Sequence, residues 1–355
     1  MKKKVLVGMS GGVDSATAAL LLKEQGYDVT GATLRLHHYK DRPGTCGSAD
    51  DIEEAARVAT QLGIEHIILD FCVEFEQEVM RHFVAEYCRG RTPNPCIDCN
   101  RTMKFGKMFD WALENGFDYI ATGHYARVDF EEATGYYRLL RGIDLHKDQS
   151  YVLYQMTQHQ LAHLLLPVGE YDKPAIRAMA ARMGLSNAQK PDSQDICFVP
   201  DGDYVHFLQD FGKATLLPGK FIDRDGTVLG DHRGLAAYTT GQRKGLGVSA
   251  DRPLYVISKN GENNTILLGD DRDLFSSALR ASRVNWVFPP AKRVIRATAK
   301  TRYSQRECAA VITIEKDDTV RLDFEEPQRA VTAGQAVVFY QGSLVLGGGT
   351  IEEIF

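Results

Sequence analysis

The stretch Lys4-Val5-Leu6-Val7-Gly8-Met9-Ser10-Gly11-Gly12-Val13-Asp14-Ser15 decides the fold of the N-terminal part of the chain. Residues 5–7 are a short apolar run typical of a buried strand, and the Ala- and Leu-rich segment 16–23 is a strong helix former. Paired glycines let the backbone approach a ligand closely, and the N–H groups that open a helix can donate to a phosphate. We therefore predict a strand, a tight anion-binding loop and a helix.

The order of residues in this loop disfavours two common nucleotide-binding motifs. The loop lacks the Gly-Lys-[Ser/Thr] ending of the P-loop and the Gly-x-Gly-x-x-Gly order of dinucleotide-binding proteins. The run Ser-Gly-Gly-Val-Asp-Ser at 10–15 instead resembles the pyrophosphate loop of the N-type ATP pyrophosphatases. These enzymes split ATP into AMP and pyrophosphate while they adenylate a carbonyl oxygen. The resemblance implies ATP and Mg²⁺ as cofactors, with Asp14 as a candidate Mg²⁺ ligand.

Length and composition are those of an ordinary protein with two or three domains. The 355 residues are 44% hydrophobic and 25% charged, and a net charge of -5 does not by itself indicate nucleic-acid binding. We find no apolar segment of the ~18 residues needed to span a bilayer, so we expect a cytoplasmic protein without a membrane partner. Seven irregularly spaced cysteines do not resemble a secreted disulfide framework.

Strand and helix patterns alternate up to about residue 205. Strands are expected at 27–34, 65–69 and 119–122, and helices at 48–62, 75–89, 105–114, 158–166 and 173–184. This alternation predicts an α/β domain with a doubly wound parallel sheet over residues 1–205, with ligands at the carboxyl ends of the strands. Leu34 lies at such an end, either as a core residue or as part of an adenine pocket.

The composition and pattern of the sequence change after residue 205. Residues 206–278 are dense in glycine and turn pairs between short strand-like runs, which predicts a small β-rich domain. Residues 279–355 contain alternating strands, which predict a C-terminal β-barrel. The barrel strands are expected at 293–303, 309–314, 319–324 and 336–340.

Two polar segments carry the cysteines best placed for chemistry. Residues 90–100 predict a proline-stiffened loop with Cys96 and Cys99, and residues 190–199 predict a polar turn with Cys197 and a strand-like end. A closed zinc site is not supported, because no second Cys-x-x-Cys pair occurs. From the residues alone, Cys96 and Cys99 remain an incidental pair, a redox or nucleophilic pair, or metal ligands. The other cysteines in helical or strand patterns are expected to be structural: Cys72, Cys88 and Cys308.

One local signal favours RNA binding. From 280 to 306 there are eight Lys or Arg residues and no Asp or Glu. Strand periodicity places Arg296, Lys300 and Arg302 on one face, which could follow a phosphate backbone or could simply be solvated. Trp286, Phe288 and Tyr303 are candidate platforms for unpaired bases. Two further polar sites are open between ligand contact and a structural or solvated role: His124 and Lys147-Asp148-Gln149-Ser150.

Six segments extend the resemblance along nearly the whole chain: 8–15, 94–100, 121–126, 147–151, 193–198 and 346–349. Together they resemble the tRNA 2-thiouridylase family of PP-loop enzymes. The resemblance implies ATP-dependent thiolation at C2 of the wobble uridine (position 34) of tRNA, with release of AMP and pyrophosphate. It also implies a persulfide sulfur from a cysteine desulfurase or a sulfur relay, and a reductant.

The resemblance implies roles for individual residues. Cys197 resembles the position that carries the persulfide, and Cys99 resembles the partner thiol that attacks it and ends in a disulfide. The implied ATP contacts are Gly8, Met9, Ser10, Gly11, Gly12, Val13, Asp14, Ser15, Leu34 and Gly123. The implied contacts to the target base or the tRNA are Asn94, Pro95, Cys96, His124, Lys147, Asp148, Gln149, Arg302, Tyr303, and Tyr340 or Gln341.

The chain departs from the family pattern at Cys96. Some members have an Asp there, to which an acid/base role has been given, and a thiol is a poorer proton carrier near neutral pH. Either another group such as Asp98 does this work or the work is not needed. The three thiols of Cys96, Cys99 and Cys197 could alternatively hold an iron–sulfur cluster, which would replace the persulfide by a cluster-bound sulfide. We favour the persulfide.

Overall fold

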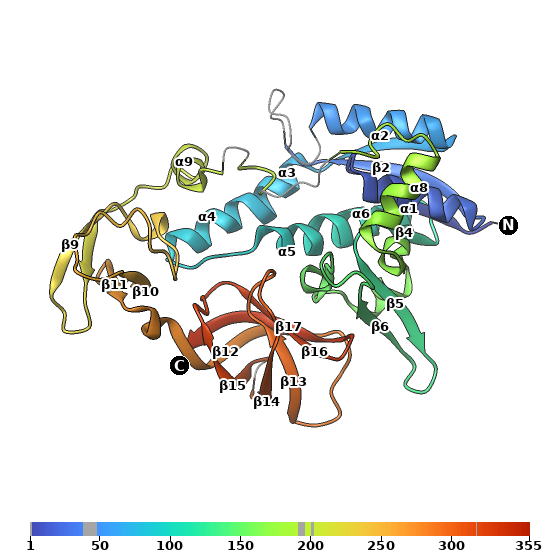
Figure 1. The fold of residues 1–355 in the computed structure, drawn as a ribbon. Helices are drawn as coiled ribbons and strands as arrows, with labels where there is room; N and C mark the ends of the chain where they lie inside the picture. The colour runs from blue at the N-terminus through green and yellow to red at the C-terminus, as the bar shows by residue number, and fades with distance from the viewer. Residues whose placement is uncertain (1, 38–47, 191–195, 200–201, 317) are drawn as a thin grey trace.

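The computed structural model describes residues 2–37, 48–190, 196–199, 202–316 and 318–355. Figure 1 shows an N-terminal α/β part, a small lobe in yellow and orange, and a red C-terminal barrel, with the helices between α3 and α6 running across the molecule. In this described part of the chain, no helix is both long and apolar enough to cross a membrane.

The N-terminal part is built on a five-stranded parallel sheet with the order β3-β2-β1-β4-β7. Its strands are β1 (Lys4–Gly8), β2 (Asp28–Arg35), β3 (Glu65–Asp70), β4 (Tyr119–Ala121) and β7 (Leu164–Leu165). Alternate residues of β1 face opposite layers, because Val5 and Val7 pack with α1 (Val13–Glu24) and α2 (Ala49–Leu62), whereas Leu6 packs with α6 (Met108–Glu114). Helices cover both faces, which confirms the expected doubly wound sheet.

Two long helical stretches cross the middle of the molecule. The first comprises α3 (Cys72–Phe75), a π-helical segment (Glu76–Met80) and α4 (Arg81–Cys88). The second comprises α5 (Pro95–Cys99), a π-helical segment (Asn100–Lys107) and α6. The expectation of a loop throughout residues 90–100 is wrong, because Pro95 opens a helix that the Asn94 side chain caps by accepting from Cys96 N. Cys96 and Cys99 therefore lie on a helix.

The single helix expected at 158–166 is also corrected. α7 (Gln158–Ala162) is short, and Leu164 and Leu165 then pair with Ile120 and Ala121 as the edge strand β7. A helix follows in α8 (Lys173–Arg182), close to its expected position. Short 3₁₀ turns occur at Ser150–Leu153, Pro167–Glu170, Leu235–Ala237 and Asp271–Leu274. The expected strand-like end after Cys197 is a turn at 196–199, and residues 191–195 lie outside the described chain.

The small lobe consists of α9 (Tyr204–Asp210) and a four-stranded sheet with the order β10-β11-β8-β9. The strands are β8 (Gly219–Ile222), β9 (Val228–His232), β10 (Tyr255–Asn260) and β11 (Thr265–Gly269). Phe221, Val256 and Ile266 form the centre of its hydrophobic cluster.

The C-terminal barrel is closed by six antiparallel strands in the order β12-β15-β14-β13-β16-β17, with β17 pairing back to β12. They are β12 (Phe275–Trp286), β13 (Val294–Lys300), β14 (Cys308–Ile314), β15 (Val320–Arg329), β16 (Ala336–Gln341) and β17 (Leu344–Ile354). A hairpin of β5 (Ala126–Glu131) and β6 (Tyr136–Arg141), from the N-terminal part, extends this sheet where Leu140 pairs with Leu344. The barrel confirms the expected fold class.

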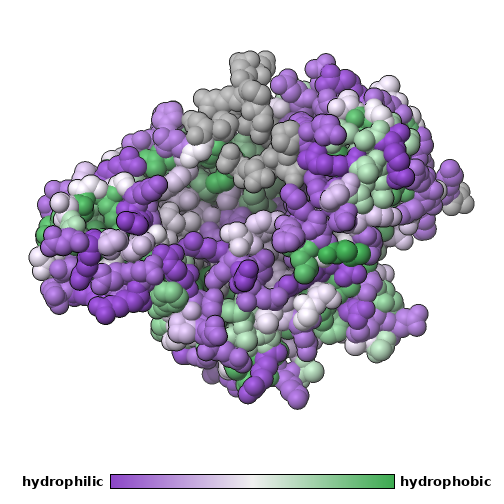
Figure 2. Space-filling view, in the orientation of Figure 1, coloured by the Kyte–Doolittle hydropathy of each residue, from purple (hydrophilic) through white to green (hydrophobic). Residues whose placement is uncertain are grey.

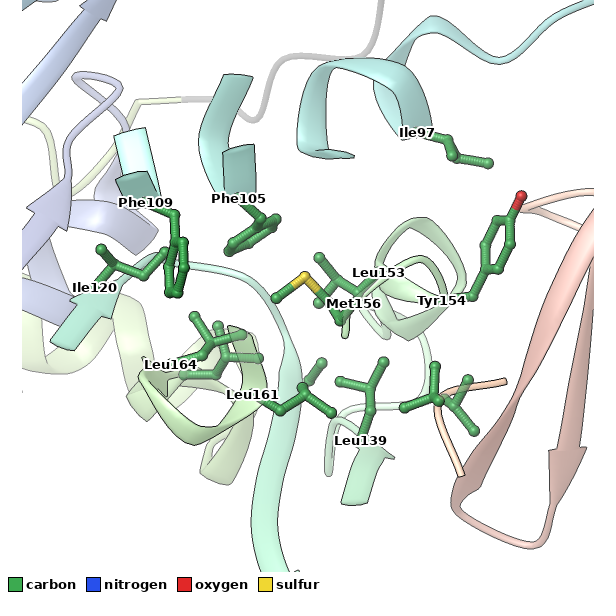
Figure 3. Close-up of a cluster of buried hydrophobic side chains, with 14 of the residues drawn as sticks. Ile97, Phe105, Phe109, Ile120, Leu139, Leu153, Tyr154, Met156, Leu161 and Leu164 are labelled. Carbon is green, nitrogen blue, oxygen red and sulfur yellow. The ribbon is translucent and has the colours of Figure 1, made fainter. Parts of the chain in front are cut away.

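The α/β part and the barrel share one hydrophobic cluster. Figure 3 shows Ile97, Phe105 and Phe109 of the central helical stretch converging with Tyr154 and Met156. Val338, Tyr340 and Val345 of the barrel belong to the same cluster. Gly348 permits this packing, since a Cβ there would lie 2.7 Å from the Tyr154 ring. The helix that carries Cys96 and Cys99 is therefore joined to the barrel through this shared cluster.

Candidate active site

The loop between β1 and α1 forms where it was expected. Gly12 is the N-cap residue of α1 and has no side chain, so the first N–H groups of the helix remain accessible to a ligand. Gly11 adopts a φ of 70°, and a Cβ there would lie 2.9 Å from the Asp51 carbonyl oxygen. Ser10 N donates to Ser15 Oγ at 3.2 Å, which ties the loop to the helix. The loop is preorganised for an anion.

The other expected ATP contacts lie around the same point of the sheet. Strand order reverses between β1 and β4, which is where open α/β sheets bind ligands. Gly123, just after β4, touches the loop so closely that a Cβ would lie 2.6 Å from Ser15 N. Leu34 is half-buried near the end of β2, where Thr33 Oγ1 donates to the Met9 carbonyl at 2.9 Å. The reversal point of the sheet thus brings these predicted residues together.

A buried lysine beneath the loop was not foreseen. Lys173, 7% exposed at the start of α8, donates to both carboxylate oxygens of Asp14 at 2.8 and 2.9 Å. Tyr125 Oη also donates to Asp14 at 2.8 Å. Because these partners occupy the carboxylate, Asp14 does not present an open Mg²⁺ ligand, and we derive no step through Mg²⁺. The sequence marks Lys173 only as a helix start, and its partner lies far away along the chain.

The two central cysteines lie against one hydrophobic cluster. Cys99 and Cys197 both pack on the cluster formed by Phe75, Phe83 and Phe198, and Leu34 at the ATP end contacts it too. Cys99 and Cys197 are partly buried, whereas Cys96 is exposed. The thiols that are distant in sequence are therefore brought to one region, beside the end of β2.

Among the remaining described cysteines, Cys72 is buried, Cys308 is partly buried and Cys88 is exposed. Burial raises the pKa of Cys72 to about 12 and that of Cys308 to about 11, and it also raises the pKa of Cys88. These thiols remain protonated near neutral pH, and a thiol attacks poorly compared with a thiolate.

Several expected RNA contacts lie inside the protein. His124 is 8% exposed, bonds Thr122 Oγ1 through Nδ1 at 2.7 Å, and has a pKa held well below its usual range by burial. The Asp148 carboxylate accepts from Gly142 N and Ser150 Oγ. Pro95 and Tyr340 are buried as well. In this structure these side chains lie beneath the surface and support the residues that form it.

Other expected RNA contacts do reach the surface. Tyr303 is 42% exposed, and the pKa of its phenol is raised by burial and by the electrostatic effects of Asp148 and Cys96. Lys300 places its ammonium group 5.8 Å from the Tyr303 ring. Arg302 is more constrained, since it donates to the Ala330 carbonyl and to Thr332 Oγ1 at 2.7 and 2.8 Å. Three further residues of the expected set are partly accessible: Asn94, Lys147 and Gln149.

Known proteins match this chain over nearly its whole length. The models called tRNA methyl transferase HUP domain, tRNA methyl transferase PRC-barrel domain and Aminomethyltransferase beta-barrel domain match residues 3–201, 205–270 and 276–351. The tRNA-specific 2-thiouridylase MnmA of Clostridioides difficile is 46% identical, with 99% of both chains covered. That of Heliobacterium modesticaldum is 50% identical, over 99% of this chain and 93% of its own. The chain belongs to the tRNA-specific 2-thiouridylase family.

Membership in the tRNA-specific 2-thiouridylase family confirms the resemblance seen in the sequence and the enzyme class, a tRNA sulfurtransferase. Among solved structures, a 4-thiouridine synthetase–RNA complex with bound ATP is 17% identical over 58% of this chain and 50% of its own. Its TM-score of 0.37 is too low to support an inference.

Asp98 is not placed to replace the family's Asp at position 96. Its carboxylate is bonded to His82 Nδ1 at 3.0 Å and accepts from Arg101 at 3.4 Å. At about 100° per residue, Asp98 points roughly opposite to Cys96 on the helix. Within the part of the chain that the structure describes, no three His, Cys, Asp or Glu side chains form a group that could hold a metal ion. We therefore derive no step through a cluster on the three cysteines.

The contact between His82 and Asp98 predicts a pH-dependent stability. The hydrogen bond with Asp98 raises the pKa of His82 above its usual value of 6.5, although burial opposes this. Such a pair stabilises the folded protein fully at pH values below the pKa of the histidine in the unfolded chain. This stabilisation is lost as the pH rises through the higher pKa of the histidine in the folded protein. In thermal unfolding, the difference in Tm between the unsubstituted protein and His82→Gln should be largest below the ordinary pKa of 6.5 and should decrease as pH rises through the raised pKa of His82 in the folded protein.

The control for this measurement is His146→Gln, because the His146 side chain is exposed. A difference for His82→Gln that stays constant over the whole pH range would contradict the assignment.

Proposed function

We propose that this protein uses ATP to thiolate C2 of the wobble uridine (position 34) of tRNA, with Cys197 carrying the sulfur and Cys99 as its partner thiol. The observation that carries the proposal is the shared hydrophobic cluster, on which Cys99, Cys197 and Leu34 all lie. This arrangement connects the nucleotide end of the sheet with the pair of thiols. Relatives at 46–50% identity over 99% of this chain bear the name tRNA-specific 2-thiouridylase, which supports the same reaction here.

The first step is adenylation of the base. The open N–H groups at the start of α1 hold the ATP phosphates, and the positive end of the helix dipole favours their charge. Lys173 neutralises Asp14, which would otherwise repel the phosphates from within the loop. Uridine O2 attacks the α-phosphorus, the bond to the β-phosphate breaks, and pyrophosphate leaves. O2 is then bonded to AMP, a good leaving group.

The second step is sulfur transfer. The terminal sulfur of a Cys197 persulfide attacks C2, and AMP departs with O2. The Cys99 thiolate then attacks Cys197 Sγ, which breaks the sulfur–sulfur bond to the base and leaves 2-thiouridine and a Cys99–Cys197 disulfide. A dithiol reductant supplies the two electrons that restore both thiols. The persulfide sulfur comes from a cysteine desulfurase or a sulfur relay protein.

The RNA lies on the face that carries Cys96, Tyr303 and Lys300. Hydrophilic side chains cover most of the face seen in Figure 2, which is hollowed near its centre. Tyr303 offers a ring for stacking on an unpaired base, and Lys300 a cation for a phosphate. In this proposal the buried residues His124, Asp148 and Tyr340 act by supporting the loops that bind the RNA. Arg302 acts by holding its own loop against the segment that contains Ala330 and Thr332.

The test is a reconstituted reaction with unmodified tRNA, ATP and a persulfide donor, followed by nucleoside analysis. We expect 2-thiouridine, with AMP and pyrophosphate formed in step with it. Absence of a thionucleoside, under both aerobic and anaerobic conditions, would overturn the proposal. AMP formation that depends on a small carbonyl compound and not on tRNA would instead assign the chain to the synthetases that share this loop.

A further inference from the structure

A polar cavity lies between the central helices and the barrel, away from the nucleotide loop. Its volume is about 390 Å³, which is within the range of ligand pockets. Asn94, which caps the second central helical stretch, lines it together with Ile97, Asp98 and Arg101 of that stretch, and Arg283 lines it from the barrel. These helical positions share one face at i, i+3, i+4 and i+7, whereas Cys96 and Cys99 lie on the opposite face. The cavity is thus one helix away from the thiols.

The carboxylates of this cavity already have partners. Glu86 is 3% exposed and pairs with Arg89 at 3.1 Å and with Arg91 at 2.7 Å. Asp98 is held by His82 and Arg101. Their negative charges are therefore compensated within the wall, and they do not oppose an anion in the cavity.

Arg283 is a cation that interacts electrostatically with the Glu352 carboxylate but forms no ion pair with it. It is exposed, and it makes no ion pair or hydrogen bond with any residue that the structure describes. It also has a φ of 52°, at the point where the register of β12 against β17 shifts between Ser282 and Asn285. A left-handed backbone is unfavourable for a residue with a long side chain, and bulges re-aim side chains. The bulge therefore directs an unpaired guanidinium toward the cavity at a conformational cost.

The remaining wall offers hydrogen-bonding groups suited to a base. Gln155 donates through Nε2 to Tyr154 Oη at 2.8 Å, and its Oε1 is buried without a hydrogen-bond partner among the described residues. Asn285 donates through Nδ2 to the carbonyls of Tyr154 and Met156, which leaves its Oδ1 as an acceptor. Amide groups of this kind read the edges of unpaired bases.

We propose that this cavity receives a tRNA nucleotide adjacent to the thiolated uridine, with its backbone phosphate bound by Arg283 and its base facing Gln155 and Asn285. The inference rests on the proposed function, since it needs RNA at Asn94 and Cys96. A nucleotide bound in the cavity fixes the RNA strand on one side of the helix, while the target base reaches the thiols on the other side. It therefore makes the neighbouring nucleotide part of substrate recognition.

The test compares variants at Arg283 by their affinity for unmodified tRNA at several salt concentrations. Arg283→Asn removes the cation but suits the left-handed backbone, so its Tm should not fall. We expect its affinity to drop about tenfold, and the slope of log K against log salt to become shallower by about 0.7, the value for one lost phosphate contact on a single strand. Arg283→Lys should keep the slope. Arg182→Gln, which removes an exposed cation of α8, is the charge-matched control.

A second measurement locates the nucleotide. A photoreactive base on either side of the wobble uridine should crosslink to residues of the cavity wall, and less so in Arg283→Asn. An unchanged affinity and slope for Arg283→Asn, or an equal loss in Arg182→Gln, would overturn the inference while thiolation by the unsubstituted protein still upheld the proposed function. Inorganic phosphate bound through Arg283 with no effect on tRNA binding would likewise overturn it, as an ion site. Failure of thiolation despite Arg283-dependent tRNA binding would instead refute the proposed function.

Discussion

Replacement of Cys197 by serine is expected to abolish 2-thiouridine formation while ATP and tRNA still bind. A hydroxyl group cannot carry a persulfide, so the sulfur-transfer step has no nucleophile. Loss of a nucleophile that forms a covalent intermediate lowers the rate by on the order of 10³-fold or more. The partly buried position of Cys197 on the aromatic cluster tolerates serine sterically. Nucleoside analysis after incubation with tRNA, ATP and a persulfide donor measures the effect.

The partner thiol is expected to fail at a different point. In Cys99→Ser the persulfide still attacks the adenylated base, but no thiolate resolves the product. A covalent complex of protein and tRNA should therefore accumulate and be released by an added thiol. Cys88→Ser is the matched control, because burial raises the pKa of the Cys88 thiol and it lies outside the shared cluster.

Undiminished thiolation by Cys197→Ser would refute the assigned chemistry.

The parts of the fold that local pattern determines were predictable. Strands β1, β2 and β3 and the helices α1 and α2 follow from apolar periodicity and from helix-start signals such as Ser48, whose side chain accepts from Asp51 N. The loop at 8–15 was predictable for the same reason, because its glycines stand between a clear strand and a clear helix. The family relationship was also visible, since its motifs are spread along the chain.

The errors arise where long-range contacts override local preference. Two prolines at 93 and 95 indicate a loop, but Pro95 occupies a helix position where a missing N–H costs nothing. Leu164 and Leu165 fit a helix by pattern, yet a free edge beside β4 makes them a strand. The joining of the β5–β6 hairpin to the barrel likewise depends on pairing across the chain, which no local pattern encodes.

The candidate site, like the fold, was predictable from the sequence only in part. Its loop and its thiols could be named from the sequence, because a glycine-rich anion loop combined with these cysteine segments is typical of few kinds of enzyme. The ion pair between Lys173 and Asp14, and that between His82 and Asp98, could not, because each joins side chains from separate elements. The sequence left His124 open between a ligand contact and a structural role, and its burial beside Phe105 and Thr122 could not be read from its position after a strand end.

Replacement of Gly123 by alanine is expected to weaken ATP binding by about 100-fold, with only a moderate loss of stability. The added Cβ would lie 2.6 Å from Asp14 C and Ser15 N, which are backbone atoms and cannot rotate away. The start of α1 must therefore move outward, at a cost of about 1–3 kcal/mol in the free energy of unfolding. The same shift moves the N–H groups that hold the phosphates. A displacement of ~1 Å in a preorganised site can lower its effectiveness by about 10²-fold, and we expect a loss of ATP affinity of that order.

Calorimetric titration with ATP, paired with denaturant unfolding, separates the two effects of Gly123→Ala. Gly261→Ala is the control, since a Cβ at Gly261 would meet no atom within 4 Å and its φ lies outside the left-handed region. If Gly123→Ala bound ATP as tightly as the unsubstituted protein, the phosphates could not lie between the end of β4 and the start of α1. That result would move the nucleotide away from the point where the sheet order reverses. A loss of ATP affinity with a retained fold would place the ATP phosphates at this contact between the end of β4 and the start of α1.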